Sequence, residues 1–180
     1  HSMLDAFSQH ATHPYFQASD GELVVAGRKI TELAAELGTP FYVYDRTVMT
    51  RKVRELRAAL PKEVEIHYAM KANPMPEVVR HFCGLVDGID VASAREMDVA
   101  IAAGMAPASI SFAGPGKTPA ELERAVASGI VINIESELEM QRAAEIARRT
   151  GTRPNVAVRV NPDFELKASG MKMAGWPKQF

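Results

Sequence analysis

The sequence predicts an α/β protein built on a parallel sheet. Five short runs of apolar, often β-branched residues alternate with segments of helical periodicity, which is typical of βαβ units. The first four runs end 21 residues apart, at Lys71, Ala92, Ala113 and Ile134. The fifth run ends near Arg159 or Val160, after a longer helical segment. The predicted strands are Val64–Met70, Gly88–Ala92, Ile110–Ala113, Ile130–Ile134 and Val156–Val160.

Three of the intervening helices begin with a capping-box pattern, in which a Ser or Thr is followed three residues later by Glu. The hydroxyl would accept a hydrogen bond from an unpaired backbone N–H, and the Glu would reach back to the cap residue. The pairs are Ser93 with Glu96, Thr118 with Glu121 and Ser136 with Glu139. Pro119 stands at the first helical position of the middle helix, a position that proline favours.

The ends of the chain show weaker patterns. Residues 4–20 are polar and have no period, and residues 161–180 combine glycines and prolines in what we expect to be a long loop. His1 and Ser2, which precede Met3, are interpreted as the remnant of a tag. Between these regions the pattern predicts a strand at 23–25, a helix at 30–37, a strand at 41–44 and a helix at 47–60.

Composition excludes several classes of function. The 180 residues include 21 basic and 22 acidic side chains, so no basic field is available for nucleic acid or an anionic membrane. No apolar run reaches the roughly 18 residues of a membrane span, and the N-terminus does not resemble a signal peptide. The single cysteine, Cys83, has no partner for a disulfide, which fits a reducing compartment. We therefore expect a cytoplasmic protein.

Candidate site residues lie on one face of the predicted sheet. Side chains alternate along a strand, so each strand has a bulky apolar face and a small or polar face. In α/β barrels and open α/β sheets, ligands bind at the carboxyl ends of the strands. The polar residues near those ends are Lys71, Asp90, Ser111, Glu135 and Arg159.

Lys71 is the strongest candidate for a catalytic residue among them. An amine that loses hydration at a barrel mouth has a lowered pKa, and a neutral amine is what a Schiff base requires. An ion pair between Lys71 and Asp90 is an alternative that the spacing leaves open.

Several motifs, in the right order and spacing, resemble those of the fold-type III pyridoxal-phosphate decarboxylases. That family includes the diaminopimelate, ornithine and arginine decarboxylases. The segment Tyr68–Pro74 is similar to the family's lysine motif, and the resemblance extends from about residue 22 to the end of the chain. The other matching segments are Gly38–Asp45, Gly88–Ser93 with Glu96, Phe112–Thr118, Asn133–Ser136 and Arg159–Pro162.

The resemblance implies a (β/α)8 TIM barrel with a β domain, and pyridoxal 5′-phosphate as the cofactor. It implies a Schiff base on Lys71, with Asp90 beside the cofactor, Arg159 near its ring and Glu96 supporting the cluster. A homodimer with shared active sites is also implied. The expected domains are an N-terminal tail at 1–21, a segment of the β domain at 22–46 and an incomplete barrel at 47–180.

Two departures from the family pattern affect the expected function. A closed barrel takes about 250 residues, and only five of its eight units are present, so we expect an N-terminal fragment that is inactive alone. The family's remaining cofactor residues would follow Phe180. The loop at 163–173 differs from the diaminopimelate pattern and is closer to an exosortase-associated branch and to enzymes for carrier-tethered amino acids. The expected substrate is therefore a basic, diamino or carrier-protein-bound L-amino acid.

Other functional interpretations have weaker support in the sequence. A decarboxylase-like regulator without catalysis remains the main alternative, although the presence of both Lys71 and Asp90 argues against it. An alanine-racemase-like enzyme is disfavoured because Pro74-Met75-Pro76 stands where racemases carry Tyr-Gly-His. Gly116-Lys117-Thr118 suggests a P-loop, but Ser111 occupies the position of its first glycine. His67 is interpreted as a packed interior histidine.

Overall fold

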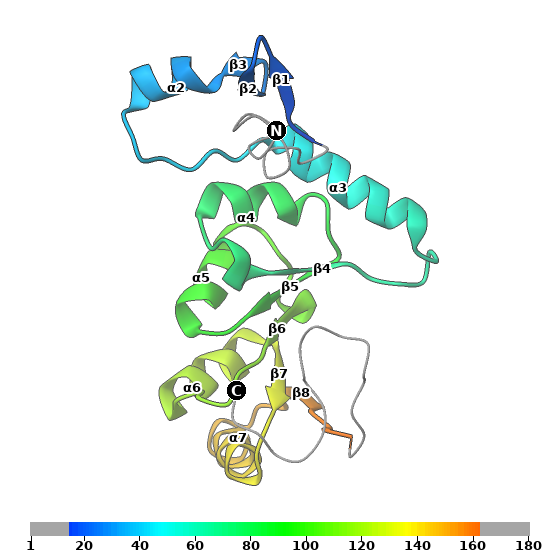
Figure 1. Cartoon of the computed structure of the whole chain (residues 1–180). Coiled ribbons are helices and arrows are strands. Elements are labelled where there is room, and N and C mark those ends of the chain that lie inside the picture. The colour runs from blue at the N-terminus through cyan, green and yellow to red at the C-terminus, as the bar shows by residue number, and fades with distance from the viewer. Residues whose placement is uncertain (1–14, 163–180) are drawn as a thin grey trace. The chain divides into compact units, whose positions relative to one another are not determined.

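The computed structural model describes residues 15–162, which belong to two compact units divided after Val64 (Figure 1). The first unit contains a three-stranded antiparallel sheet and two helices. The second contains five parallel strands with helices between them. No helix of the described residues is long and apolar enough to cross a membrane. The expected domain boundaries at 22–46 and 47–180 stay a prediction.

Two tight hairpins build the sheet of the first unit. Its strands are β1 (Gln17–Ser19), β2 (Glu22–Val25) and β3 (Arg28–Lys29). The turn residues Asp20-Gly21 and Ala26-Gly27 all have positive φ. Positive φ at both central residues gives a turn whose twist matches that of the flanking strands. The two glycines adopt this conformation without the steric cost of a side chain.

Two helices follow these hairpins and agree with the sequence prediction. Helix α2 (Ile30–Leu37) buries Leu33, and helix α3 (Arg46–Ala59) buries Val53. Asp45 caps α3 by accepting a hydrogen bond from the Thr47 backbone N–H. The cap explains why the helix begins one residue earlier than its periodicity alone indicated.

Two expectations for the first unit were wrong. No strand forms at 41–44, where Tyr42 is 91% exposed, because no strand of the described residues pairs with that segment. Strand β1, by contrast, lies in the stretch that was expected to be irregular. All three residues of β1 are exposed, so the sequence shows no apolar alternation that would predict this strand. Hydrogen bonding to β2 alone defines it.

The strands of the second unit pair in sequential order, β4-β5-β6-β7-β8. The α/β prediction is confirmed, and the arrangement is that of a partial (β/α)8 barrel with an antiparallel sheet preceding it in the chain. The strands are β4 (His67–Ala69), β5 (Gly88–Val91), β6 (Ile110–Phe112), β7 (Val131–Ile134) and β8 (Asn155–Val158).

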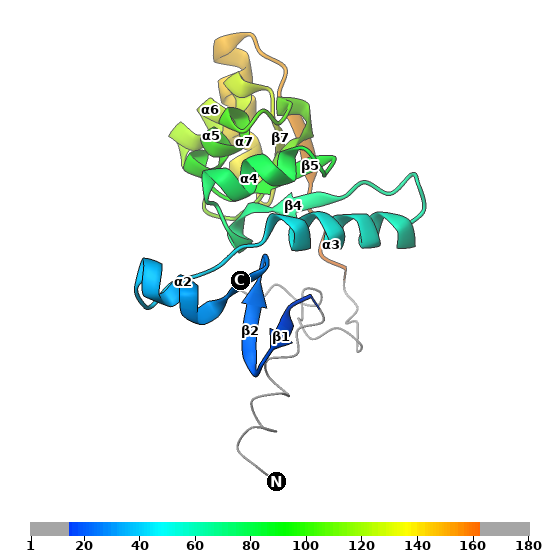
Figure 2. The same ribbon diagram turned by 90° about the horizontal axis from the view of Figure 1, so that it is seen from above.

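The connections of this sheet place its helices on one side, as the right-handed crossover rule requires (Figures 1 and 2). A short 3-10 turn, η1, follows β4, and a second one, η2, precedes β6. The helices and turns are η1 (Met70–Ala72), α4 (Pro76–Cys83), α5 (Ala94–Ala102), η2 (Pro107–Ser109), α6 (Pro119–Ser128) and α7 (Glu137–Thr150).

The predicted alternation of side chains is confirmed in the middle strands. Ile89, Ile110, Phe112 and Ile132 are completely buried in the core, whereas Asp90 and its neighbours on the opposite face are half-buried. Burial of one such aliphatic side chain contributes about 1.5–3 kcal/mol. The other large core residues come from the covering helices and include Val79, Met97, Leu122 and Val126.

Strand β8 departs from this pattern. Val156 and Val158 were expected to face helices, yet they are 51% and 68% exposed. Strand β8 is the edge of the described sheet, and no helix of residues 15–162 follows it. The apolar face that the pattern predicted for β8 therefore has no cover among these residues, and this part of the prediction is not confirmed.

The three predicted caps form, but only one is a complete capping box. Thr118 and Glu121 exchange both hydrogen bonds at the start of α6. Ser93 and Ser136 accept from the backbone three residues on, as predicted. Their glutamates instead reach one residue further back, to the backbone N–H groups of Ala92 and Glu135. These N–H groups belong to the loops that end β5 and β7.

Gly88 is expected to be intolerant of any side chain. A Cβ atom there would lie 2.5 Å from the His67 ring and 2.6 Å from the Ser109 carbonyl oxygen, which is fixed backbone. We expect Gly88→Ala to lower the free energy of unfolding by about 1–3 kcal/mol through overpacking. Gly116→Ala is the matched control, because a Cβ there meets nothing within 4 Å. Urea denaturation of both variants provides the measurement, and equal losses would contradict this account.

Candidate active site

The structure brings the predicted polar residues together in two groups at the carboxyl ends of the strands. Ser111 Oγ donates to Asp90 Oδ1 at 2.7 Å, and Arg159 Nη1 lies 3.7 Å from Glu135 Oε1. Lys71 follows β4 in η1. The parallel register places Asp90 opposite Ala69, two residues before Lys71. Among the described residues, no ion pair joins Lys71 to Asp90, so the alternative of a structural ion pair finds no support.

The turn that carries Lys71 is fixed on both sides. Met70, just before the lysine, is completely buried. The Tyr68 hydroxyl donates to the Asn73 carbonyl oxygen at 2.9 Å, and the Tyr68 ring stacks on Phe82 with 4.1 Å between centroids. Lys71 itself is exposed in the described structure, contrary to the expected loss of hydration. The backbone that carries Lys71 is thus held in place, and its side chain is accessible.

His67 is a member of this cluster that the sequence interpretation missed. It was expected to be a packed interior histidine, but its side chain is 32% exposed and contacts two carboxylates. Nδ1 lies 3.1 Å from Asp90 Oδ1, and Nε2 lies 3.2 Å from Glu65 Oε2. Burial lowers the pKa of His67, but the hydrogen bonds to Glu65 and Asp90 outweigh burial and raise this pKa above its ordinary value. The available signal was that His67 and Asp90 share the polar face of neighbouring strands.

The second group is organised by Glu135. Its side chain is 5% exposed, and its Oε1 accepts a hydrogen bond from the Gly114 backbone N–H at 2.9 Å. The Arg159 backbone N–H donates to the Ile134 carbonyl oxygen at 3.0 Å, so the arginine starts from a position fixed by β7. Its side chain is 27% exposed. Glu135 therefore anchors the loop after β6 and offers a counter-charge to Arg159.

Glu96 does not contact the other predicted site residues in the described structure. Its Oε2 accepts from the Ala92 backbone N–H at 3.2 Å, and its own N–H donates to Ser93 Oγ. These bonds fix the segment between β5 and α5. Any effect of Glu96 on Asp90 passes through this backbone.

Lys117 carries a structural role that the P-loop comparison did not anticipate. Its side chain is 1% exposed, and its Nζ donates to Glu139 Oε1 at 2.9 Å. Nζ also donates to the carbonyl oxygens of Gly114 and Asn133, each at 2.7 Å. All three N–H groups are thus used inside the protein, whereas a P-loop lysine must reach a phosphate.

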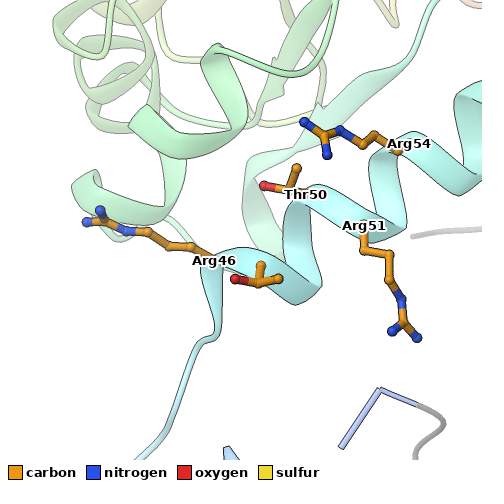
Figure 3. A pocket seen from close by; sticks show the side chains of 5 residues that line it. Arg46, Thr50, Arg51 and Arg54 are labelled. Atoms are coloured by element: carbon orange, nitrogen blue, oxygen red, sulfur yellow. The ribbon is translucent and has the colours of Figure 1, made fainter. Parts of the chain in front are cut away.

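A shallow pocket of about 370 Å³ lies elsewhere, on α3 (Figure 3). Three arginines and two threonines line it: Arg46, Thr47, Thr50, Arg51 and Arg54. In Figure 3, Arg51 extends away from Arg54. The Arg51 guanidinium lies 4.3 Å from the centroid of the Tyr15 ring. The pocket contains none of the predicted site residues. The described residues also include no cluster of three or more potential metal ligands.

Comparison with known proteins identifies the family. Residues 46–178 match the model described as pyridoxal-dependent decarboxylase, pyridoxal binding domain. This chain belongs to the pyridoxal-dependent decarboxylase family. The match spans β4 to β8, and thus Lys71 and every other residue of the two polar groups. Membership implies pyridoxal 5′-phosphate as the cofactor, as the resemblance had indicated.

The curated relatives of this pyridoxal-dependent decarboxylase chain include enzymes with different substrates in their names. A diaminopimelate decarboxylase of Aquifex aeolicus is 40% identical over 166 residues, which are 89% of this chain and 39% of the relative. The L-glutamyl-(BtrI acyl-carrier protein) decarboxylase of Niallia circulans is 37% identical over 153 residues, 84% of this chain and 36% of the relative. The chain therefore spans less than two fifths of the length of these relatives.

Solved structures agree with the family assignment. The crystal structure of AQ1208 from Aquifex aeolicus superposes with a TM-score of 0.79 at 39% identity, covering 85% of this chain and 38% of that one. Diaminopimelate decarboxylase from Helicobacter pylori, complexed with L-lysine, gives a TM-score of 0.71 at 30% identity. It covers 78% of this chain and 36% of the other. The predicted fold is thus confirmed by proteins of the same family.

The buried pair of Lys117 and Glu139 is expected to dominate the stability of this edge of the sheet. Lys117→Met would leave the Glu139 carboxylate buried without its counter-ion, and such a loss costs about 3–5 kcal/mol. The control is Arg148→Ala, which removes an exposed ion pair with Glu145 and should cost less than about 1 kcal/mol. Thermal and urea unfolding measure both variants. Similar stabilities for the two would disprove the assigned role.

Proposed function

We propose that this chain is part of a pyridoxal 5′-phosphate-dependent decarboxylase of L-amino acids, in which Lys71 is the residue that attaches the cofactor's aldehyde. One observation carries the proposal: the accessible Lys71 amine stands at the carboxyl end of β4, inside the segment that matches the pyridoxal binding domain. Because the chain spans 39% of the Aquifex relative, the activity belongs to the protein as a whole.

The residues of the site fit this cofactor chemically. An aldehyde reacts with a primary amine, and the turn between Tyr68 and Asn73 holds the Lys71 amine in an exposed position. Asp90 supplies a carboxylate on the neighbouring strand, and Arg159 supplies a cation two strands beyond Ser111. When bound, pyridoxal phosphate supplies an electron sink for the pair left behind as the substrate loses CO₂.

Each proposed residue has a distinct part. Lys71 would hold the cofactor covalently, and its amine, when free, would be a base or acid close to the reacting carbon. Asp90 holds a negative charge near that amine, and Arg159 orients anionic groups at the ring. Glu96 acts indirectly, because its bond to the Ala92 N–H fixes the segment that follows Asp90.

The substrate class that we propose is a basic, diamino or carrier-protein-bound L-amino acid. The names of the Aquifex and Niallia relatives support the diamino and the carrier-bound alternatives, respectively. The loop at 163–173, which favoured the carrier-bound alternative, lies outside the described residues. Comparing CO₂ release from free diaminopimelate and from an amino acid on an acyl-carrier protein distinguishes them. We further propose a homodimer, as the family resemblance implies, and a cytoplasmic location, as the single cysteine favours.

Trapping of the cofactor tests the role of Lys71 directly. Incubation with pyridoxal phosphate, reduction with borohydride and peptide mass spectrometry should find the phosphopyridoxyl adduct on Lys71. Lys71→Arg should abolish that adduct, because a guanidinium does not form it. Lys62→Arg, at another exposed lysine, should leave the adduct unchanged. Labelling of Lys71 no faster than Lys62 would contradict the proposal and favour a non-catalytic role.

A further inference from the structure

The imidazole of His67 lies between two carboxylates that belong to different segments. Nδ1 is 3.1 Å from Asp90 Oδ1 on β5, and Nε2 is 3.2 Å from Glu65 Oε2 just before β4. A neutral imidazole has one N–H and can donate to one carboxylate only. An imidazolium donates from both nitrogens. The geometry of the two contacts therefore fits a protonated ring.

The contact with Asp90 engages one of its two carboxylate oxygens. Oδ1 accepts from His67 and also from Ser111 Oγ at 2.7 Å, so strands β4 and β6 hold it from both sides. Among residues 15–162, no hydrogen bond involves Oδ2 of Asp90. One oxygen is thus fixed by the protein, and the other remains available to a group at the strand end.

The ring is also fixed sterically. Gly88, the register partner of His67 on β5, leaves the space that the ring occupies. A Cβ at residue 88 would lie 2.5 Å from His67 Cε1 and 2.7 Å from Nδ1. The imidazole therefore packs directly on the backbone of β5, where few rotamers are open to it. Both contacts of His67 start from a restricted position.

We propose that His67 is a positioning residue for the site at Lys71: as an imidazolium, it fixes Asp90 through Oδ1 and leaves Oδ2 to the Lys71 amine or its ligand. The proposal rests on the function proposed above for Lys71. Asp90 is opposite Ala69 in the register, two residues before Lys71. It can therefore pass a change in the charge of His67 on to the Lys71 site.

The arrangement predicts a dependence on pH. The charged groups that face the ring are Glu65 from the segment before β4 and Asp90 from β5, and β6 contributes the neutral hydroxyl of Ser111. These carboxylates raise the pKa of His67 above its ordinary value despite partial burial. The stabilisation is therefore complete at pH values below the ordinary pKa and is lost as the pH rises through the raised one. Deprotonation breaks one of the two contacts and releases Asp90.

Nitrogen-15 NMR of the imidazole rings tests the charge state without any cofactor. At pH 6, both nitrogens of His67 should be protonated, and the ring should titrate above the ordinary histidine pKa of about 6.5. Asp90→Asn and Glu65→Gln should each lower the titration midpoint of His67, because each removes one carboxylate. A midpoint at or below the ordinary histidine value of about 6.5, or one unmoved by both substitutions, would overturn the proposal.

The link to Lys71 is tested by the pH profile of its labelling with pyridoxal phosphate and borohydride. The labelling rate should show an inflection at the midpoint measured for His67 by NMR. This inflection should disappear in His67→Gln and in Asp90→Asn, and it should persist in the control His81→Gln. Circular dichroism of each variant establishes that it is folded, and Asp90→Asn keeps the test decisive if His67→Gln does not fold.

The outcomes separate this inference from the proposed function. Labelling of Lys71 with no inflection at the His67 midpoint would overturn the positioning role and leave the role of Lys71 intact. An inflection that survives both substitutions would have the same consequence. Failure to label Lys71 at any pH would instead contradict the proposed function, whereas the NMR midpoints would still report on the His67–Asp90 contact.

Discussion

One buried ion pair organises the loops at the carboxyl edge of the parallel sheet. Taking an ammonium and a carboxylate out of water is costly unless every hydrogen-bonding group is satisfied. Here Lys117 meets that condition with Glu139 and two backbone carbonyl groups, and no buried side-chain polar atom of the described residues lacks a partner. Because those partners lie in the loop after β6, in strand β7 and in the first turn of α7, the pair fixes these three segments relative to one another.

Glutamates in the first turns of the helices extend the same principle along the sheet. Glu121 accepts a hydrogen bond at 2.8 Å from the backbone N–H of Ala94, at the start of the preceding helix α5. It also closes its own capping box. The bond from Ala94 outweighs burial and lowers the pKa of Glu121 below its usual value. Its contribution to stability is therefore lost as the pH falls through that lowered pKa. Capping and the connection of neighbouring units thus use the same side chains.

Local signals in the sequence were sufficient for most of the fold. Strand and helix positions in the second unit follow from apolar periodicity, and the caps follow from short polar motifs. Strand β1 and the irregular segment at 41–44 did not follow, because a strand forms only where another segment pairs with it, and the residues of the segment itself do not reveal that pairing. The burial of Lys117 and the double contact of His67 likewise depend on which loops meet, and a spacing rule does not contain that information.

The two lysines that follow strands β4 and β6 show how the sheet separates stability from chemistry. Lys117 is buried with all three donors bound, so its amine is unavailable to a ligand. Lys71 is exposed on a turn whose backbone is held by Tyr68 and Met70, so its amine is positioned without being occupied. A reactive amine needs this combination of a fixed backbone and an accessible amino group. At the carboxyl ends of the strands, Glu135 and Glu139 make the loops near β6 and β7 rigid. The loop after β4 carries the accessible Lys71 amine.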